Sequence, residues 1–371
     1  MFAFSRASGY PFDETQELVI RRIQCTMPSV ARQHGVVSYV SLPPYQWRTR
    51  SVGIILLLGG APVPEQTDQL LEWCQSAIGP CEFASDQTRA HPGERVGTHL
   101  LRTPDGPCFL KTHKELAGWE LEVHGYERWA RAFGDQAPKL LAVRDVEPLG
   151  IIISEVSGRI LEEMSLPPDT EREVWRDAGR ALAPLHRLEV GECFGPCHRD
   201  GSCVGQPITD AIEYVTSELT SWTERGQRDR VLTSAELATI QAAHRLAPAF
   251  AGEHATPCHR DYCDANWIID ADNRWAGVID FEFAYWDVRA ADFTRYAQWE
   301  WLERPDLVDA FFEGYGEPLE GKLLQQVLVG HVQYALSAVV WGSDYGYFGF
   351  AREGHQSFER LHELLPRLGE G

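Results

Sequence analysis

The sequence predicts an α+β fold in which a small strand-rich part precedes a larger helical part. Short apolar runs separated by turn residues, a pattern typical of strands, gather between residues 98 and 155. From about residue 169 onward, long segments carry apolar residues at helical spacing. One predicted hairpin, over residues 267–279, interrupts the helical part.

Composition narrows the class of protein. The chain has 371 residues, enough for two domains or two lobes with an apolar core. Its 34 Lys and Arg residues are outnumbered by 54 Asp and Glu residues, which gives a net charge of -20. We therefore expect neither nucleic acid nor a membrane surface as a partner. A cationic small molecule would suit this charge, although a solvated acidic surface is the favoured explanation for it.

The charge distribution predicts a boundary near residue 80. Basic and acidic side chains balance in residues 1–80, so the acidic excess lies in residues 81–371. We expect an N-terminal extension over residues 1–80 that is ordered only in part. A β-rich N-lobe over residues 81–158 and a mostly helical C-lobe over residues 159–371 would follow.

Nine cysteines raise the question of disulfides or zinc. The dense group is Cys193, Cys197 and Cys203 with His198, and no second pair follows at metal-ligand spacing. No secretory signal pattern is evident. We expect reduced thiols and a cytoplasmic protein.

Each element before residue 160 has its own pattern. A short helix is expected over Thr67–Ala77, where apolar residues cluster on one side. A Pro-Asp-Gly turn separates two expected strands, and Ser157-Gly158 ends the last one. The four expected strands are Thr98–Arg102, Pro107–Thr112, Leu140–Val143 and Ile151–Glu155. A helix is expected over Glu115–Phe133, between the second and the third strand.

Helices dominate the remainder of the chain. Their apolar residues recur every three or four positions, which predicts one buried face for each helix. The expected helices are Asp169–Leu188, Asp210–Arg225, Ser234–Ala247, Leu307–Tyr315, Leu323–Trp341 and Gln356–Leu368.

The predicted hairpin brings three oxygen-bearing side chains together. Asp261 and Asn266 precede the strand Trp267–Ile269, and Asp280 follows the return strand Trp275–Ile279. A hairpin returns the chain to its starting end, so Asn266 and Asp280 should lie side by side. Their oxygens suit Mg2+, and Asp261 can take a proton from a hydroxyl group. Phosphoryl transfer is the chemistry that needs this combination.

A second copy of the motif shows how little the motif says alone. Pro196–Asp200 repeats Pro257–Asp261 residue for residue. After Asp200, however, Gly205 stands where the second copy has Asn266, and no apolar strand follows. We expect the first copy to be a polar loop.

Lys111 is the predicted contact to nucleotide phosphates. It closes the strand that contains Phe109, and the following helix offers Glu120 and Glu122 as partners for its ammonium group. A solvent-facing lysine is the alternative, and Lys114 is a weaker candidate for the same role.

In the order of these motifs, the chain resembles the aminoglycoside phosphotransferase and choline kinase superfamily of small-molecule kinases. The resemblance covers roughly residues 85–368 and implies a protein-kinase-like bilobal fold. The stretches that carry it are Phe109–Lys111, Ile151–Gly158, Gly179–Leu188, His259–Asn266 and Ile279–Asp292.

The resemblance implies a role for each matching residue. Asp261 would be the catalytic base, and Asn266 and Asp280 would hold Mg2+ on the phosphates of ATP or GTP. Lys111 would contact the α- and β-phosphates with Glu122 as its partner. Two further residues, Glu155 and Val156, would bind the adenine through their backbone, while His259 and Asp292 would support the catalytic loop.

The chain also departs from its family pattern. Only Gly93 and Gly97 are available for the turn that covers the phosphates, and residues 1–80 have no counterpart. A protein kinase is disfavoured, because Cys263 replaces the expected Lys and Glu282 replaces the Gly of Asp-Phe-Gly.

We therefore expect an ATP-dependent kinase that phosphorylates a small cationic alcohol, such as an aminoglycoside-like antibiotic or an amino alcohol, as a monomer or homodimer. A choline or ethanolamine kinase and a catalytically silent nucleotide-binding protein are the alternatives. The side chains expected near the acceptor are Glu282, Tyr285, Trp286, Asp287, Trp299, Glu300, Trp341, Asp344 and Tyr345.

Overall fold

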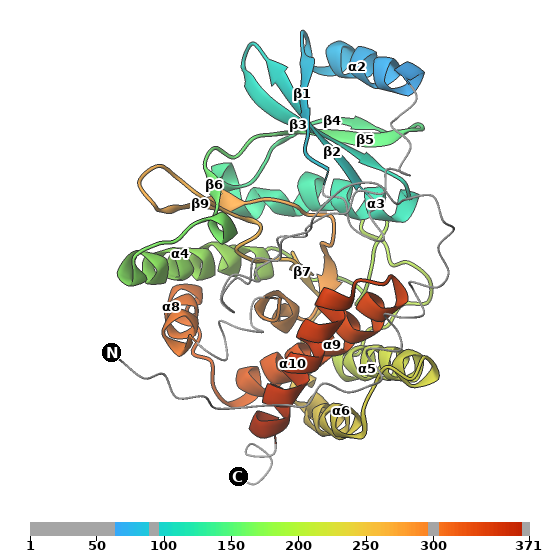
Figure 1. Ribbon diagram of the computed structural model, residues 1–371, viewed down its shortest axis with the longest axis vertical. Helices are drawn as coiled ribbons and strands as arrows, with labels where there is room; N and C mark the ends of the chain where they lie inside the picture. The colour runs from blue at the N-terminus through green and yellow to red at the C-terminus, as the bar shows by residue number, and fades with distance from the viewer. Residues whose placement is uncertain (1–63, 89–95, 296–303, 366–371) are drawn as a thin grey trace, which may run out of the picture. The chain divides into compact units, whose positions relative to one another are not determined.

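The computed structural model describes residues 64–88, 96–295 and 304–365 (Figure 1). A five-stranded antiparallel sheet forms the small lobe, with the strand order β1-β2-β3-β5-β4. The four predicted strands are present, and one strand that the sequence did not predict precedes them. The strands are β1 (Glu82–Asp86), β2 (Val96–Thr103), β3 (Gly106–His113), β4 (Leu140–Arg144) and β5 (Leu149–Ser154).

Helix α2 (Pro64–Ile78) confirms the helix expected before this sheet. Its residues Leu70 and Cys74 share a small apolar core with sheet residues such as Leu110 and Ile152. The helix therefore packs on the sheet, although it lies within the expected N-terminal extension. The boundary at residue 80 stays a prediction, and residues 1–63 lie outside the described part.

The helix expected over Glu115–Phe133 is divided into three segments. Helix α3 (Leu116–His124) continues as the π-helical turn η2 (Gly125–Trp129) and the 3-10 segment η3 (Ala130–Gln136). The change occurs where the backbone comes close to the Asp-Phe-Glu segment, because a Cβ on Gly125 would lie 3.1 Å from Phe281 Cβ. Apolar periodicity does not report such an approach, so the sequence suggested one helix.

The larger lobe contains the six predicted helices. Two of them start with a side-chain cap, since Asp210 accepts from Glu213 N and Thr233 forms a capping box with Glu236. The helices are α4 (Pro168–His186), α5 (Ala211–Arg228), α6 (Ser234–Leu246), α8 (Pro305–Tyr315), α9 (Gly321–Asp344) and α10 (Phe348–Leu364).

Helices α4 and α8 cross at backbone contact. A Cβ on Gly179 would lie 2.0 Å from Phe311 O, and one on Gly314 would lie 1.8 Å from Arg176 O. Only glycine fits at these two positions, which explains how α4 and α8 come to pack so closely.

The predicted hairpin is confirmed as β8 (Trp267–Ile269) and β9 (Trp275–Val278), with the short β6 (Arg159–Ile160) on the other edge of β8. A second small sheet pairs β7 (Thr256–Cys258) with β10 (Tyr285–Asp287). The segment η6 (Arg289–Phe293) follows β10.

The expectation of reduced thiols is corrected at one pair. Cys193 and Cys203 form a disulfide, while the other six cysteines of the described residues are free and buried. Backbone bridges within this loop bring the two Cα atoms to 6.2 Å, a distance that suits a disulfide. Sequence spacing alone does not reveal such an approach.

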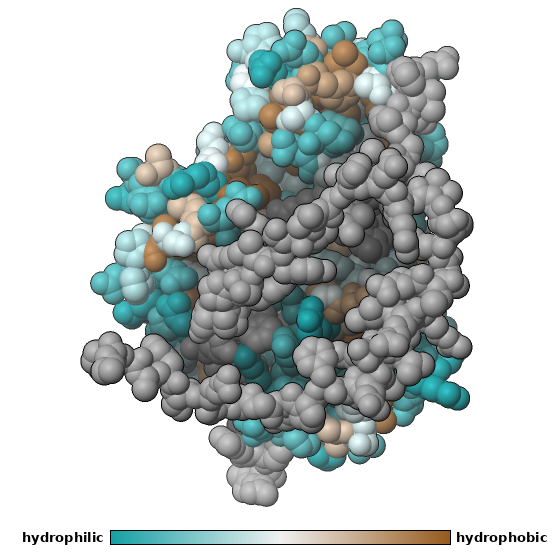
Figure 2. Space-filling model, in the orientation of Figure 1, coloured by the Kyte–Doolittle hydropathy of each residue, from teal (hydrophilic) through white to brown (hydrophobic). Residues whose placement is uncertain are grey.

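Among the described residues, helix α9 is long and apolar enough to cross a membrane, and 72% of its most apolar window is buried inside the protein. On the face drawn in Figure 2, the coloured surface is mainly hydrophilic, and apolar residues form smaller patches between the polar ones.

Candidate active site

The loop between β7 and β8 carries Asp261 and Asn266, and the end of β9 leads into Asp280. Two backbone bonds close this arrangement: Asn266 N donates to Cys263 O at 2.7 Å, and Ile279 N donates to Asn266 O at 3.0 Å. The second bond joins the two ends of the hairpin. Asn266 therefore lies beside the residue that precedes Asp280, as the sequence predicted.

Asp261 and Asn266 are in direct contact. The Asn266 Nδ2 donates to Asp261 Oδ2 at 2.9 Å and to Asp261 O at 2.8 Å. Only the NH2 of an amide can donate to a carboxylate, so the amide oxygen of Asn266 faces away from Asp261. That oxygen is the atom which a hard cation would use.

Lys111 on β3 reaches across to the hairpin. Its Nζ forms an ion pair with Glu122 on α3 and lies 2.7 Å from Asp280 Oδ1. Burial alone would lower the pKa of Lys111, but Asp280 and then Glu122 raise it well above its usual value. The ammonium group is therefore charged at neutral pH, which a phosphate contact requires.

Glu122, and not Glu120, is the partner of Lys111. Glu122 is completely buried, whereas Glu120 lies 2.9 Å from His198 Nδ1 in the loop that carries the first motif copy. That copy is a loop outside the named strands, as expected, and Arg199 in it pairs with Glu127. The open alternative between the two glutamates is thereby resolved by geometry.

Carboxylates gather where the hairpin ends. Burial, followed by the charge of Asp280, raises the pKa of Glu282 to about 8, and Asp261 contributes in the same direction. Asp280 itself has a left-handed backbone with φ of 72°, a strained conformation that recurs at functional sites. Crowded carboxylates beside an amide oxygen are a donor set that fits Mg2+.

Asp292 on η6 fixes the loop between β7 and β8 that carries Asp261. It accepts hydrogen bonds from the backbone N–H groups of His259, at 2.9 Å, and Arg260. His186 Nε2 donates to Asp292 Oδ2 at 2.9 Å, and His259 Nε2 lies 3.0 Å from Ile279 O. Burial lowers the pKa of His259, so its imidazole is neutral. These contacts support the structural roles that the resemblance implied.

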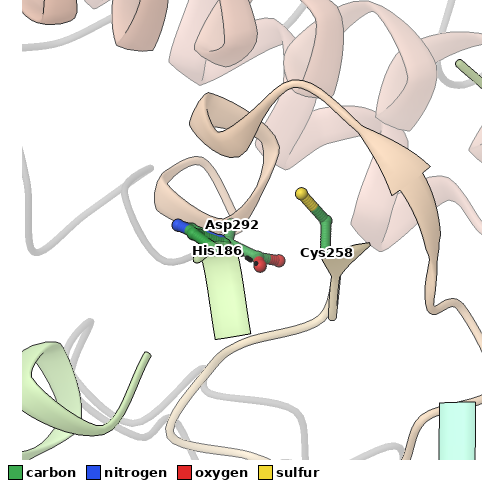
Figure 3. Close-up of side chains that lie close together, drawn as sticks. All are labelled: His186, Cys258 and Asp292. Atoms are coloured by element: carbon green, nitrogen blue, oxygen red, sulfur yellow. Dashed lines mark hydrogen bonds and ion pairs between the residues drawn. The ribbon is translucent and has the colours of Figure 1, made fainter. Parts of the chain in front are cut away.

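Figure 3 shows a second group of possible metal ligands, His186, Cys258 and Asp292, whose ligand atoms lie within 4.8 Å of one another. The hydrogen bonds to Asp292 already satisfy its oxygens. The Cys258 thiol donates to Val288 O at 3.5 Å, and burial raises its pKa well above the usual value. We therefore interpret this cluster as a hydrogen-bonded scaffold without a metal.

Arg260 joins the same loop to strand β10. It has a left-handed φ of 62°, its guanidinium lies 3.8 Å from the centre of the Tyr285 ring, and its Nε lies 2.7 Å from Asp287 Oδ2. Two of the residues expected near the acceptor, Tyr285 and Asp287, are thus engaged with Arg260.

Other residues expected near the acceptor contact one another or other parts of the protein. Asp344 pairs with Arg225, Trp341 packs on Tyr345, and the Trp286 Nε1 donates to Gly201 O. Trp299 and Glu300 lie outside the described residues, as does the turn at residues 93–95.

The predicted hinge joins β5 to β6. Glu155 is exposed, and Val156 is half-buried. A Cβ on Gly158, where φ is 149°, would lie 2.5 Å from Ile269 O, so the chain here packs closely on β8. A Cβ on Gly277 in β9 would lie 3.0 Å from Val156 Cγ1. The hinge residues therefore lie against the hairpin that positions Asn266 and Asp280.

Sequence reasoning missed Arg295. Its Nε forms an ion pair with Asp261 Oδ1, and its guanidinium lies near the rings of Phe283 and Tyr334. Arg295 stands in an irregular segment with no motif of its own, and it is one of thirty arginines in the chain. No signal in the sequence singles it out.

A lysine held by a buried glutamate, facing a hairpin with an aspartate, an asparagine and a second aspartate, defines a phosphotransferase site on a bilobal α+β fold. Residues 89–324 match the model of the phosphotransferase enzyme family, and the chain belongs to this family. None of the curated proteins matches the chain.

Solved structures confirm the predicted protein-kinase-like fold. A ternary complex of a thermostable mutant of aminoglycoside phosphotransferase APH(4)-Ia with ADP and hygromycin B has a TM-score of 0.61 at 13% identity, covering 80% of this chain and 98% of that chain. The GDP complex of aminoglycoside 2'-phosphotransferase-IIIa gives 0.60 at 13% identity, with 80% and 98% covered. The GDP and kanamycin complex of APH(2")-IIIa gives 0.60 at 15% identity, with 79% and 98% covered.

Proposed function

We propose that the protein transfers the γ-phosphoryl group of ATP to a hydroxyl group of a small molecule. The convergence of Lys111, Asp280 and Asp261 carries this proposal, because it joins a cation for phosphates, a metal ligand and a base in one place. Their spacing along the chain is wide, so the fold has brought them together.

Nucleotide binding would use both lobes. Lys111 contacts the α- and β-phosphates, and its pairing with Glu122 keeps the ammonium group in position. The backbone of Glu155 and Val156 binds the adenine edge. Structural neighbours in complex with ADP or GDP support a nucleotide co-substrate, and GTP remains a candidate beside ATP.

Asn266 and Asp280 would hold Mg2+. When bound, the ion neutralises charge on the β- and γ-phosphates. Asn266 is suited to this because its Nδ2 is engaged with Asp261, which directs the amide oxygen elsewhere. Asp280 repels a negative charge on Glu282, which is why the pKa of Glu282 is raised. A divalent cation would relieve this repulsion, so the acidic surroundings favour its binding.

Asp261 would orient the acceptor hydroxyl and accept its proton. As the hydroxyl oxygen forms a bond to the γ-phosphorus, the bond from that phosphorus to the bridging oxygen breaks, and its electron pair leaves with ADP. Asn266 and the Asp292 scaffold hold the carboxylate in place, so little reorganisation is needed at the moment of transfer.

The acceptor is proposed to be a small cationic alcohol. The net charge of -20 and the kanamycin and hygromycin B complexes of structural neighbours support an aminoglycoside-like molecule, with amino alcohols such as choline or ethanolamine as the alternative. Arg295 lies at the base, so the ammonium groups of such an acceptor would lie away from Asp261.

An acceptor screen tests the proposal. Purified protein with Mg2+ and ATP or GTP is incubated with aminoglycosides, choline, ethanolamine and sugars, and nucleoside diphosphate release is measured. We expect release above background with one acceptor class. Binding of Mg2+–ATP without acceptor-dependent release in any case would favour the catalytically silent nucleotide-binding protein. We also propose a cytoplasmic monomer or homodimer.

A further inference from the structure

Arg295 is paired with the carboxylate of Asp261, the proposed base. Its Nε forms an ion pair with Asp261 Oδ1, while Asn266 Nδ2 donates to Asp261 Oδ2 at 2.9 Å. The Cys263 Sγ lies 3.6 Å from the same Oδ1. Both oxygens of the proposed base therefore have a hydrogen-bonding partner before an acceptor arrives. In the proposed reaction, one of these oxygens must accept the hydroxyl proton.

The guanidinium is held in place by more than its charge. It lies 5.3 Å from the centre of the Tyr334 ring on α9 and 5.8 Å from that of Phe283, which follows the Asp-Phe-Glu segment. The side chain of Arg295 is 33% exposed and that of Asp261 is 11% exposed. A charge-assisted hydrogen bond to a carboxylate is shorter and stronger than a neutral one, so a single water molecule displaces the guanidinium from Asp261 poorly.

An acceptor differs from water in this competition. Its remaining groups bind elsewhere in the cleft, and that binding energy can place its hydroxyl group against Asp261 in spite of the guanidinium. Water brings no such additional binding energy. The ion pair is therefore an obstacle that an acceptor overcomes more readily than water does.

We propose that Arg295 is a positioning residue that restrains Asp261 and suppresses hydrolysis of the nucleotide when no acceptor is bound. The inference rests on the proposed function. In the suppressed reaction, the water oxygen bonds to the γ-phosphorus, the bond to the bridging oxygen breaks, and its electron pair leaves with ADP. The water proton passes to Asp261 and then to solvent.

The test is ADP release from Mg2+–ATP with no acceptor added. Arg295→Gln should hydrolyse ATP about tenfold faster than the unchanged protein, as expected for removing about 1.4 kcal/mol of restraint. Arg295→Lys keeps a positive charge and should show a smaller rise. Adding Asp261→Asn to Arg295→Gln should return hydrolysis to the original level, because the released carboxylate is then absent.

Arg289→Gln is the matched control. Arg289 stands on η6, its side chain is 24% exposed, and it pairs with Glu317 away from Asp261. Its replacement should leave hydrolysis unchanged. Thermal unfolding and Mg2+–ADP binding are measured for all variants, because a purely structural role of Arg295 would lower the unfolding temperature without any rise in hydrolysis.

Unchanged or slower hydrolysis in both Arg295 variants overturns the inference. If the unchanged protein transfers phosphate to an acceptor in the screen, the proposed function survives that result. If the unchanged protein does not bind Mg2+–ATP, both fail together. An increase that persists after Asp261→Asn is added would also overturn the inference, since the effect would then not act through the base.

Discussion

Replacing Glu282 with Gln probes the proposed cation site. Burial and the neighbouring Asp280 raise the pKa of Glu282 to about 8. At pH 7, a carboxyl group with that pKa is roughly nine-tenths protonated. A divalent cation held by Asp280 favours the charged form of Glu282 and expels its proton. Binding of Mg2+–ADP should therefore release up to about one proton more from the unchanged protein than from Glu282→Gln.

Calorimetric titration in two buffers with different heats of ionisation measures this proton release. Glu317→Gln serves as the control, because Glu317 is a partly exposed carboxylate that pairs with Arg289. It should release as many protons as the unchanged protein. Equal proton release from the unchanged protein and Glu282→Gln, with equal affinity, would refute the reasoning about the cation site.

The same group should shape stability when no cation is present. The folded protein keeps a proton on Glu282 that the unfolded chain loses above pH 4.5, the usual pKa of a glutamate side chain. This contribution to stability is fully present below pH 4.5 and is lost as the pH rises through about 8. Between pH 5.5 and pH 8 the free energy of unfolding should fall by about 3 kcal/mol on this account, at 1.4 kcal/mol per pH unit. Urea unfolding should show a flatter pH dependence for Glu282→Gln, and an unchanged slope would contradict this.

Two further replacements test the lysine pair and the scaffold. Lys111→Met should raise the KM for ATP at least tenfold. It should also destabilise the fold by about 3 kcal/mol, because buried Glu122 loses its nearest cation. The control Lys139→Met, which removes an exposed ion pair, should do neither. Asp292→Asn should cost about 2 kcal/mol in urea unfolding and slow turnover, since the bonds to His186 and the loop N–H groups weaken. Unaltered kinetics in Lys111→Met, or unaltered stability in Asp292→Asn, would count against the assigned role.

The convergence of the hairpin residues could be predicted because it is local. Asn266 and Asp280 are joined by two short strands and a turn, and a hairpin leaves little freedom in where its ends lie. The strand that carries Lys111 was likewise clear from its pattern. Motif order supplied the rest of the arrangement.

Residues two apart on a helix point in different directions, so choosing between Glu120 and Glu122 required knowing how α3 docks on the sheet. That docking depends on contacts such as the Trp119 Nε1 bond to Gly150 O at 3.3 Å, which joins distant parts of the chain. Sequence periodicity describes one element at a time and does not contain this information.

Arg295 and the Cys193–Cys203 disulfide were missed for a related reason. Arg295 meets Asp261 because η6 and the catalytic loop pack together through Asp292, a contact between segments far apart in sequence. The disulfide forms in an irregular loop whose path no repeat or alternation predicts. Long-range packing of irregular segments decides both.

The most direct test of the central claim follows the γ-phosphate itself. Labelled ATP is incubated with Mg2+ and the acceptor found in the screen, and the phosphorylated product is counted for the unchanged protein and for Asp261→Asn. We predict label on an acceptor hydroxyl with the unchanged protein, and essentially none with Asp261→Asn although it binds Mg2+–ADP with similar affinity. Transfer at a normal rate by Asp261→Asn would contradict the account.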